Sequence, residues 1–249
     1  MNPSPYTTHF TSANLRARIV KILLIVGAVV TGVAILAQTL SLAFPPITGE
    51  EDLGDNPAGV VLVLLIFLLV VFESVIYLTT VVFFLMWLYR AHNNVRAFNQ
   101  WSRLEHSAGW AVGSFFIPIV NLFVPYRAVK EVWQKSTAPD EAFVVTPEPP
   151  ATFPLWWLFW LLAGFASKIS FRLSLNDSVP ESTSTIVSMV AGVLSIGAAV
   201  FAYLVVDAID KRQEETSLKV NLRKFPEPPP PPPNLSMPET VPVSGTTNS

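Results

Sequence analysis

Four long stretches of the sequence are almost free of charged residues, and they limit the folds that this chain can adopt. They cover residues 22–44, 58–88, 152–173 and 183–206. A helix needs about 20 apolar residues to cross the hydrocarbon core of a bilayer, and each stretch meets that length. We therefore expect an all-α protein, an integral membrane bundle of four transmembrane helices.

The composition agrees with a membrane protein and excludes several kinds of site. Only 14% of the 249 residues are charged, against about 25% in soluble proteins. The formal net charge of -2 provides no basic field for nucleic acid. Cysteine is absent and there are three histidines, so disulfides and thiolate metal ligands are excluded. We expect no metal and no cofactor.

The two ends of the chain differ from its middle. We predict a cytoplasmic N-terminal segment over residues 1–18, a membrane domain over residues 19–210 and a cytoplasmic tail over residues 211–249. The tail contains six consecutive prolines among polar residues. This composition is typical of a polyproline II segment followed by disorder.

A fifth apolar stretch, residues 109–126, is interrupted by Pro118 and contains Asn121 and Pro125. Cytoplasmic loops carry an excess of Lys and Arg, which makes the number of spans testable from charge. Four spans place fourteen of the 16 Lys and Arg residues on one side, whereas a fifth span divides them evenly. We therefore predict a re-entrant or interfacial element over residues 107–136, and an inner-membrane protein with both termini in the cytoplasm.

Glu73 is the only charged residue in the second stretch, and it lies at about the same estimated depth as Lys168. Ionisable residues inside a membrane are candidates for function. An ion pair of Glu73 with Lys168, or with Arg172 as the alternative partner, would keep these charges in lipid. Such a pair serves either a proton or ion relay or the fixing of two helices. The second interpretation is favoured, because one pair does not make a pathway.

The second stretch runs into a segment without helix breakers, so we expect the helix to continue beyond the membrane. Trp87, Arg90 and Asn94 would share one face of it. This face suits a phosphate or lipid headgroup. It equally suits the free backbone groups around Pro118 and Asn121, and we favour that role because the interrupted element needs partners.

Residues 125–136 have the spacing of an amphipathic helix, with an apolar stripe on one side and basic residues on the other. Such helices lie in the inner membrane interface, where their cations attract anionic lipid. The basic residues concerned are Arg127, Lys130 and Lys135. In the fourth stretch, Ala191, Ser195 and Ala199 form a face of small residues that predicts close helix packing.

A joint pattern of residues extends from the second stretch to the basic helix. It reads W-x-x-R-x-x-x-N, then G-W, then F-I-P-x-x-N-L-x-x-P-Y, and finally W-x-x-S. The pattern resembles that of a family of bacterial multi-helix membrane proteins known only as a domain of unknown function. The resemblance implies a membrane fold and a bacterial inner membrane, and no activity. It rests on Trp87, Arg90, Asn94, Gly109, Trp110, Phe116, Ile117, Pro118, Asn121, Leu122, Pro125, Tyr126, Trp133 and Ser136.

No phosphate-binding loop, zinc-protease motif or nucleophile elbow occurs in the sequence. We therefore expect a non-enzymatic membrane module that organises lipid, a protein partner or further copies of itself at the inner leaflet through residues 87–136. The alternative is a small transporter or channel component that uses Glu73.

Reporter fusions test the predicted topology. Because the Lys and Arg residues gather on one side, reporters after Asn14, near Pro139 and after Lys224 should give cytoplasmic signals. Reporters at Gly54 and Ser178 should give external signals. An external signal near Pro139 would instead establish five spans.

Overall fold

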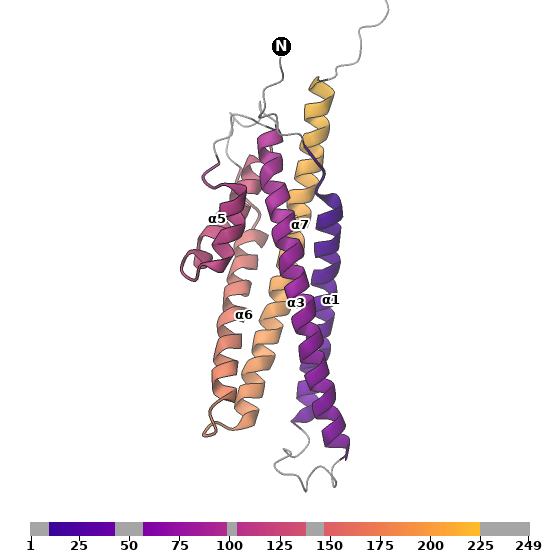
Figure 1. Cartoon of the computed structure of the whole chain (residues 1–249), viewed down its shortest axis with the longest axis vertical. Coiled ribbons are helices and arrows are strands. Elements are labelled where there is room, and N and C mark those ends of the chain that lie inside the picture. Colours follow the sequence, from indigo (N-terminus) through magenta and orange to yellow (C-terminus); the bar gives the residue numbers. More distant parts are fainter. Residues whose placement is uncertain (1–9, 43–56, 99–103, 138–146, 225–249) are drawn as a thin grey trace, which may run out of the picture.

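The computed structural model describes residues 10–42, 57–98, 104–137 and 147–224, and within them it contains helices and no strand (Figure 1). Four of the helices are long and apolar enough to cross a membrane. The predicted all-α architecture with four spans is therefore confirmed. The four helices are α1 (Asn14–Ser41), α3 (Pro57–Phe98), α6 (Thr152–Ser174) and α7 (Glu181–Lys224).

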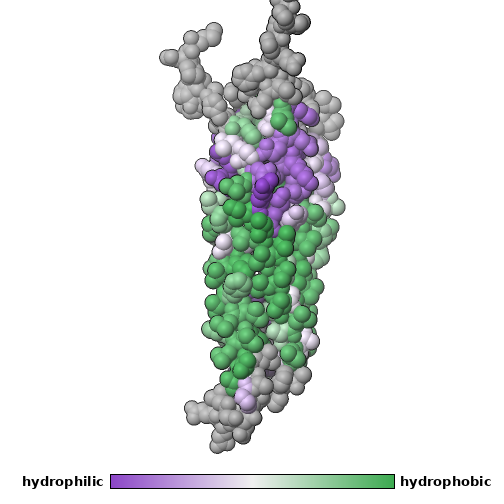
Figure 2. All heavy atoms as spheres, turned by 90° about the vertical axis from the view of Figure 1, so that its right-hand side faces the viewer, coloured by the Kyte–Doolittle hydropathy of each residue, from purple (hydrophilic) through white to green (hydrophobic). Residues whose placement is uncertain are grey.

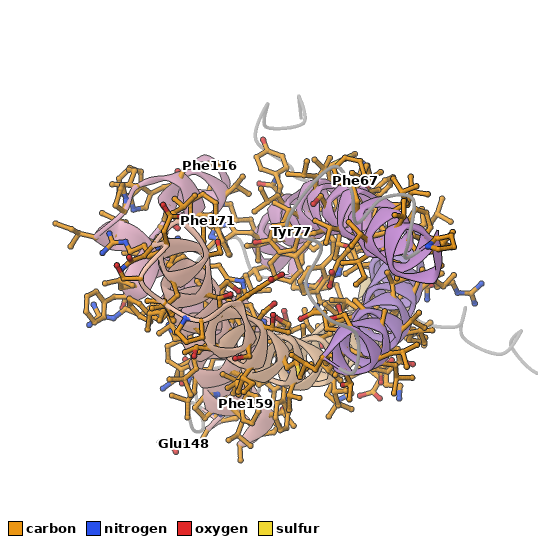
Figure 3. The ribbon with its side chains drawn as sticks, turned by 90° about the horizontal axis from the view of Figure 1, so that it is seen from below. Phe67, Tyr77, Phe116, Glu148, Phe159 and Phe171 are labelled. Atoms are coloured by element: carbon orange, nitrogen blue, oxygen red, sulfur yellow. The ribbon has the colours of Figure 1, made fainter. Side chains whose placement is uncertain are left out.

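The four long helices follow a curved row in the order α6, α7, α1 and α3, as seen from below in Figure 3. The helix α7 lies in the middle of the row and contacts α6, α1 and, less extensively, α3. Small residues on α7 allow this close packing. Ala191 is buried, and a Cβ added to Gly192 would lie 3.0 Å from Ile35 of α1. The face predicted from Ala191, Ser195 and Ala199 thus includes a residue buried in the bundle.

Two of the helices are much longer than a bilayer requires. With 42 and 44 residues, α3 and α7 reach about 63 to 66 Å at the helical rise of about 1.5 Å per residue, twice the roughly 30 Å core. Their apolar stretches end near Leu88 and Val206, and charged residues follow. Figure 2 shows the resulting boundary between an apolar band and a hydrophilic end.

We call this hydrophilic end of the bundle the head, and define it as residues 10–21, 89–98, 104–137 and 207–224. The expected continuation of the second helix past residue 88 is confirmed, because α3 runs unbroken to Phe98. The predicted start of a disordered tail at residue 211 is wrong, because α7 remains helical to Lys224. The proline-rich residues lie outside the described part of the chain.

The interrupted element forms a helical hairpin, here defined as residues 108–135. It contains α4 (Ala108–Gly113), the 3-10 turns η1 (Ser114–Phe116) and η2 (Val120–Leu122), and α5 (Val124–Lys135). Pro118 lies in the turn between η1 and η2, where its missing N–H costs no helical hydrogen bond. The hairpin lies beside the head end of α6 (Figure 1). The indole N–H of Trp157 on α6 donates to the carbonyl of Leu122 at 3.1 Å and fixes it there.

Candidate functional site

The head is organised around the buried side-chain amide of Gln213 on α7. Its Nε2 donates to the carbonyl of Ala91 on α3 at 2.8 Å and to the hydroxyl of Ser136, just beyond α5, at 3.0 Å. Its Oε1 accepts from Nδ2 of Asn94 at 3.1 Å. Thr216, one turn later, donates to the carbonyl of Ser136 at 3.1 Å. One side chain therefore joins α3, α7 and the end of the hairpin.

Asn94 extends this network to the N-terminal segment. Its Nδ2 donates to the carbonyl of Thr11 at 3.1 Å, and its Oδ1 accepts from the N–H of Thr11 at 3.4 Å. The prediction that Asn94 binds the backbone near Pro118 and Asn121 is wrong, because its amide is occupied by Thr11 and Gln213. Asn94 binds the segment before α1 instead.

Two of the three signature tryptophans, Trp87 and Trp133, lie in the packed interior. Trp87 is fully buried, and its ring centroid lies 5.4 Å from that of Phe84, which also contacts Phe115 and Trp156. Trp133 packs on Phe153 of α6 at 5.8 Å. The guanidinium carbon of Arg212 lies 4.4 Å from the centroid of the Trp133 ring, a cation–π contact between α7 and α5. These aromatic contacts attach the hairpin to the bundle.

A buried carboxylate on α5 fixes the start of the hairpin. Oε1 of Glu131 accepts from the N–H of Glu105 and from Nζ of Lys135, both at 2.7 Å. Its Oε2 lies 3.7 Å from Nδ1 of His106. Lys135 was predicted to face lipid headgroups together with Arg127 and Lys130. It lies in an internal ion pair, because Glu131 one turn earlier occupies a buried position.

His92 lies next to this carboxylate and is fully buried on α3. Neither ring nitrogen makes a hydrogen bond with the described residues. Burial lowers the pKa of His92 below its ordinary value of 6.5. Glu131 and the backbone of His106 oppose the shift, while the charges of Arg96 and His106 act in the same direction as burial. Protonation of His92 is therefore less favourable in the folded head than in water.

Most of the remaining signature residues lie exposed or half-buried on the hairpin, beside four residues that are not part of the signature, namely Ile119, Phe123, Arg127 and Lys130. Phe116, Ile119 and Phe123 are 70%, 77% and 59% exposed, and Figure 3 places Phe116 at the outer edge of the molecule. The exposed residues Gly109, Trp110, Pro118 and Arg127 accompany them, and Asn121, Tyr126, Lys130 and Arg90 are half-buried. Pro125 is buried in the first turn of α5. The signature thus has an internal part that holds the head together and an external part around the hairpin turn.

The predicted intramembrane ion pair is not formed. Glu73 accepts a hydrogen bond from the hydroxyl of Thr31 on the neighbouring helix α1. Lys168 and Arg172 are exposed on α6, and Nζ of Lys168 lies 5.8 Å from the centroid of the Phe165 ring. Among the described residues, no ion pair joins Glu73 to either cation, because α1 and not α6 packs beside this part of α3.

The sequence interpretation overlooked Gln213 and Glu131, which are the central polar groups of the head. Gln213 follows the buried residues Val206 and Ile209 at spacings of seven and four, so it continues the buried stripe of α7. This spacing was the available signal. Glu131 gave a weaker one, namely its position four residues before Lys135.

Replacing Gln213 by Leu tests the central role of its amide. The variant keeps the side-chain volume but removes the buried acceptor of Asn94 and the buried donor to Ala91 and Ser136, which costs about 1–3 kcal/mol. We expect a clearly lower melting temperature in detergent. Gln38→Leu is the matched control, because the buried Oε1 of Gln38 has no partner within the described part of the chain. That change should leave the melting temperature unchanged or raise it. Equal losses in both variants would contradict the network.

The buried His92 predicts a pH dependence. Its pKa is lower in the folded head than in the unfolded chain, so its contribution to stability is complete above about pH 6.5 and is lost as the pH falls below that value. The melting temperature of the wild-type protein should therefore fall more between about pH 7.5 and about pH 5.5 than that of His92→Leu. Parallel curves would show that His92 does not titrate differently on folding.

Comparison with known proteins places this architecture in a family. No curated protein and no solved structure matches the chain. The model of one family, described as "Domain of unknown function (DUF4328)", matches residues 59–211. This range begins in α3, includes the hairpin and α6, and ends on α7 two residues before Gln213. The chain belongs to the DUF4328 family of domains of unknown function.

Proposed function

We propose that this protein is a non-enzymatic module of the bacterial inner membrane that binds anionic lipid at the inner leaflet through its hairpin. Both termini and the head then face the cytoplasm. The excess of Lys and Arg around the head supports this orientation. The observation that carries the proposal is the exposed apolar turn of the hairpin, next to exposed basic residues.

The position of the turn suits insertion into the membrane interface. Leu122 is bound to Trp157, which lies near the head end of the apolar part of α6. The exposed rings of Phe116 and Phe123 and the side chain of Ile119 are therefore at the level where the apolar band begins. An exposed apolar surface of this kind is covered by acyl chains in an interfacial element.

The adjacent charges suit an anionic headgroup. Arg127 is exposed one turn after Phe123, and Lys130 is half-buried one turn later. Each basic residue near an anionic leaflet contributes about 1 kcal/mol of attraction. Lys135 adds little, because Glu131 already neutralises it. The binding surface that we propose consists of Phe116, Ile119, Phe123, Arg127 and Lys130.

Photoactivatable lipids test this surface. The protein is placed in vesicles that contain a trace of phosphatidylglycerol or phosphatidylcholine with a photoreactive headgroup, and the labelled peptides are mapped by mass spectrometry. We expect residues 114–130 to be labelled more strongly by the anionic lipid. Arg127→Gln together with Lys130→Gln should lower this labelling by about five-fold per charge removed, the equivalent of about 1 kcal/mol each.

The control is Lys168→Gln together with Arg172→Gln, which removes the same charge from exposed positions near the opposite end of α6. It should leave the labelling of the hairpin unchanged. Equal labelling of the hairpin by the anionic and the neutral lipid in the wild-type protein would contradict the proposal.

A further inference from the structure

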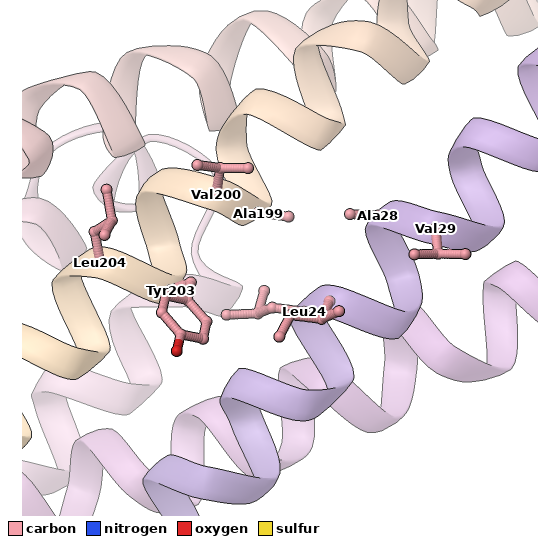
Figure 4. A pocket seen from close by; sticks show the side chains of 8 residues that line it. Leu24, Ala28, Val29, Ala199, Val200, Tyr203 and Leu204 are labelled. Carbon is pink, nitrogen blue, oxygen red and sulfur yellow. The ribbon is translucent and has the colours of Figure 1, made fainter.

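A second surface, away from the turn of the hairpin, is hollowed between two of the long helices. An apolar groove of about 420 Å³ lies between α1 and α7. In Figure 4, Ala28 and Ala199 point toward one another across it, and their small side chains leave the space between the helices open. Leu24 and Tyr203 line the same groove nearer the head.

The groove ends on a group of charges at the boundary of the apolar band. One turn beyond Leu24 and Tyr203, Nζ of Lys21 on α1 lies 2.8 Å from Oδ1 of Asp207 on α7. Nζ of Lys211 lies 2.7 Å from Oδ2 of the same carboxylate. Lys21 also lies 5.8 Å from the centroid of the Tyr203 ring. Two ammonium groups share one carboxylate, so this group keeps a net positive charge.

The neighbouring residues leave that positive charge in place. Arg18 adds a further cation one turn before Lys21. Asp210 is buried, and burial raises its pKa while Lys21 and Arg18 act in the opposite direction. With Asp207 and Asp210 both counted as charged, the three cations still leave one positive charge. The next acidic residues, Glu214 and Glu215, follow about one turn further along α7, beyond the end of the apolar band, and Glu215 acts electrostatically on Lys211. The apolar groove therefore leads to a cationic site at the level of the headgroups.

We propose that the groove between α1 and α7 holds one acyl chain of an anionic phospholipid, with the lipid phosphate against Lys21 and Lys211. The chain lies between Ala28 and Ala199, and the phosphate takes the place of water on two ammonium groups. Figure 1 places α1 on the opposite side of the bundle from α5, so the groove between α1 and α7 is separate from the turn of the hairpin.

The charges argue against a second copy of the protein as the occupant. Two copies with the same orientation in one membrane place the same residues at the same height, and a two-fold axis brings the same faces together. Lys21, Lys211 and Arg18 would then face their counterparts, and like charges repel. An anionic phospholipid brings the opposite charge to the same place.

The first test removes the charge of Lys211, which does not connect two helices. Lys211 has a 70% exposed side chain and pairs within its own helix, while Lys21 keeps the contact between α1 and α7. Lys211→Gln should lower the labelling of residues 22–30 and 199–206 by photoactivatable phosphatidylglycerol by about five-fold, the equivalent of about 1 kcal/mol. Arg172→Gln, an exposed cation near the other end of the bundle, is the control and should have no effect. Unchanged labelling of these residues in Lys211→Gln would contradict the headgroup position.

The second test fills the groove. Ala28→Phe with Ala199→Phe should abolish the labelling of residues 22–30 and 199–206 by photoactivatable phosphatidylglycerol, while the labelling of the hairpin persists. Gly164→Phe is the matched control, because nothing lies within 4 Å of a Cβ at that position on α6. Labelling of the hairpin alone in the wild-type protein would contradict this proposal and support the other one.

The third test addresses a second copy directly. The chain has no cysteine, so Val29→Cys introduces a single thiol at the groove. A disulfide-linked dimer formed in vesicles under mild oxidation would show that another copy occupies the groove and would overturn the proposal. Monomers that retain phosphatidylglycerol are the expected result.

Discussion

The amide of Gln213 is the contact on which the rest of the head depends. A buried side-chain amide has two N–H donors and an acceptor oxygen that need partners. Here the carbonyl of Ala91 and the hydroxyl of Ser136 accept from the amide, and Asn94 donates to it. The three partners belong to α3 and to the end of the hairpin, so the amide is satisfied in only one mutual arrangement of these elements and α7. Asn94 in turn binds the backbone of Thr11, and this contact positions the segment before α1.

The membrane part and the head are held by different forces, although α3 and α7 run through both. In lipid, apolar side chains gain nothing from leaving solvent, so close packing has to stabilise the helices. The contact of Gly197 with the ring of Phe159 is an example, because a Cβ at Gly197 would lie 2.4 Å from that ring. In the head, the same helices are stabilised by polar networks and by the burial of apolar side chains away from water. The ion pair of Lys21 with Asp207 lies at the boundary between the membrane part and the head.

The sequence predicts the number of spans because length and hydropathy decide it, and the charges show that the hairpin does not cross. It does not predict which helices are neighbours. Glu73 and Lys168 have matching depths, yet depth is a single coordinate, and α3 packs on α1 at that level, so Thr31 becomes the partner of Glu73. For the same reason the sequence identifies the signature residues but not the residues that they contact. Asn94 and Ser136 meet on Gln213 of α7, more than 70 residues away from either.

The unbroken length of α7 gives the protein a mechanical property. The rotation of this helix about its own axis is fixed at two levels: at Gly197, where only a glycine fits against Phe159, and at Gln213, where the amide is enclosed by its partners. The two levels are about 24 Å apart at the helical rise, and the helix has no break between them. The rotation of α7 in the head therefore has to match its rotation in the membrane part, and an insertion or deletion of one residue between the two levels would put them out of register by about 100°.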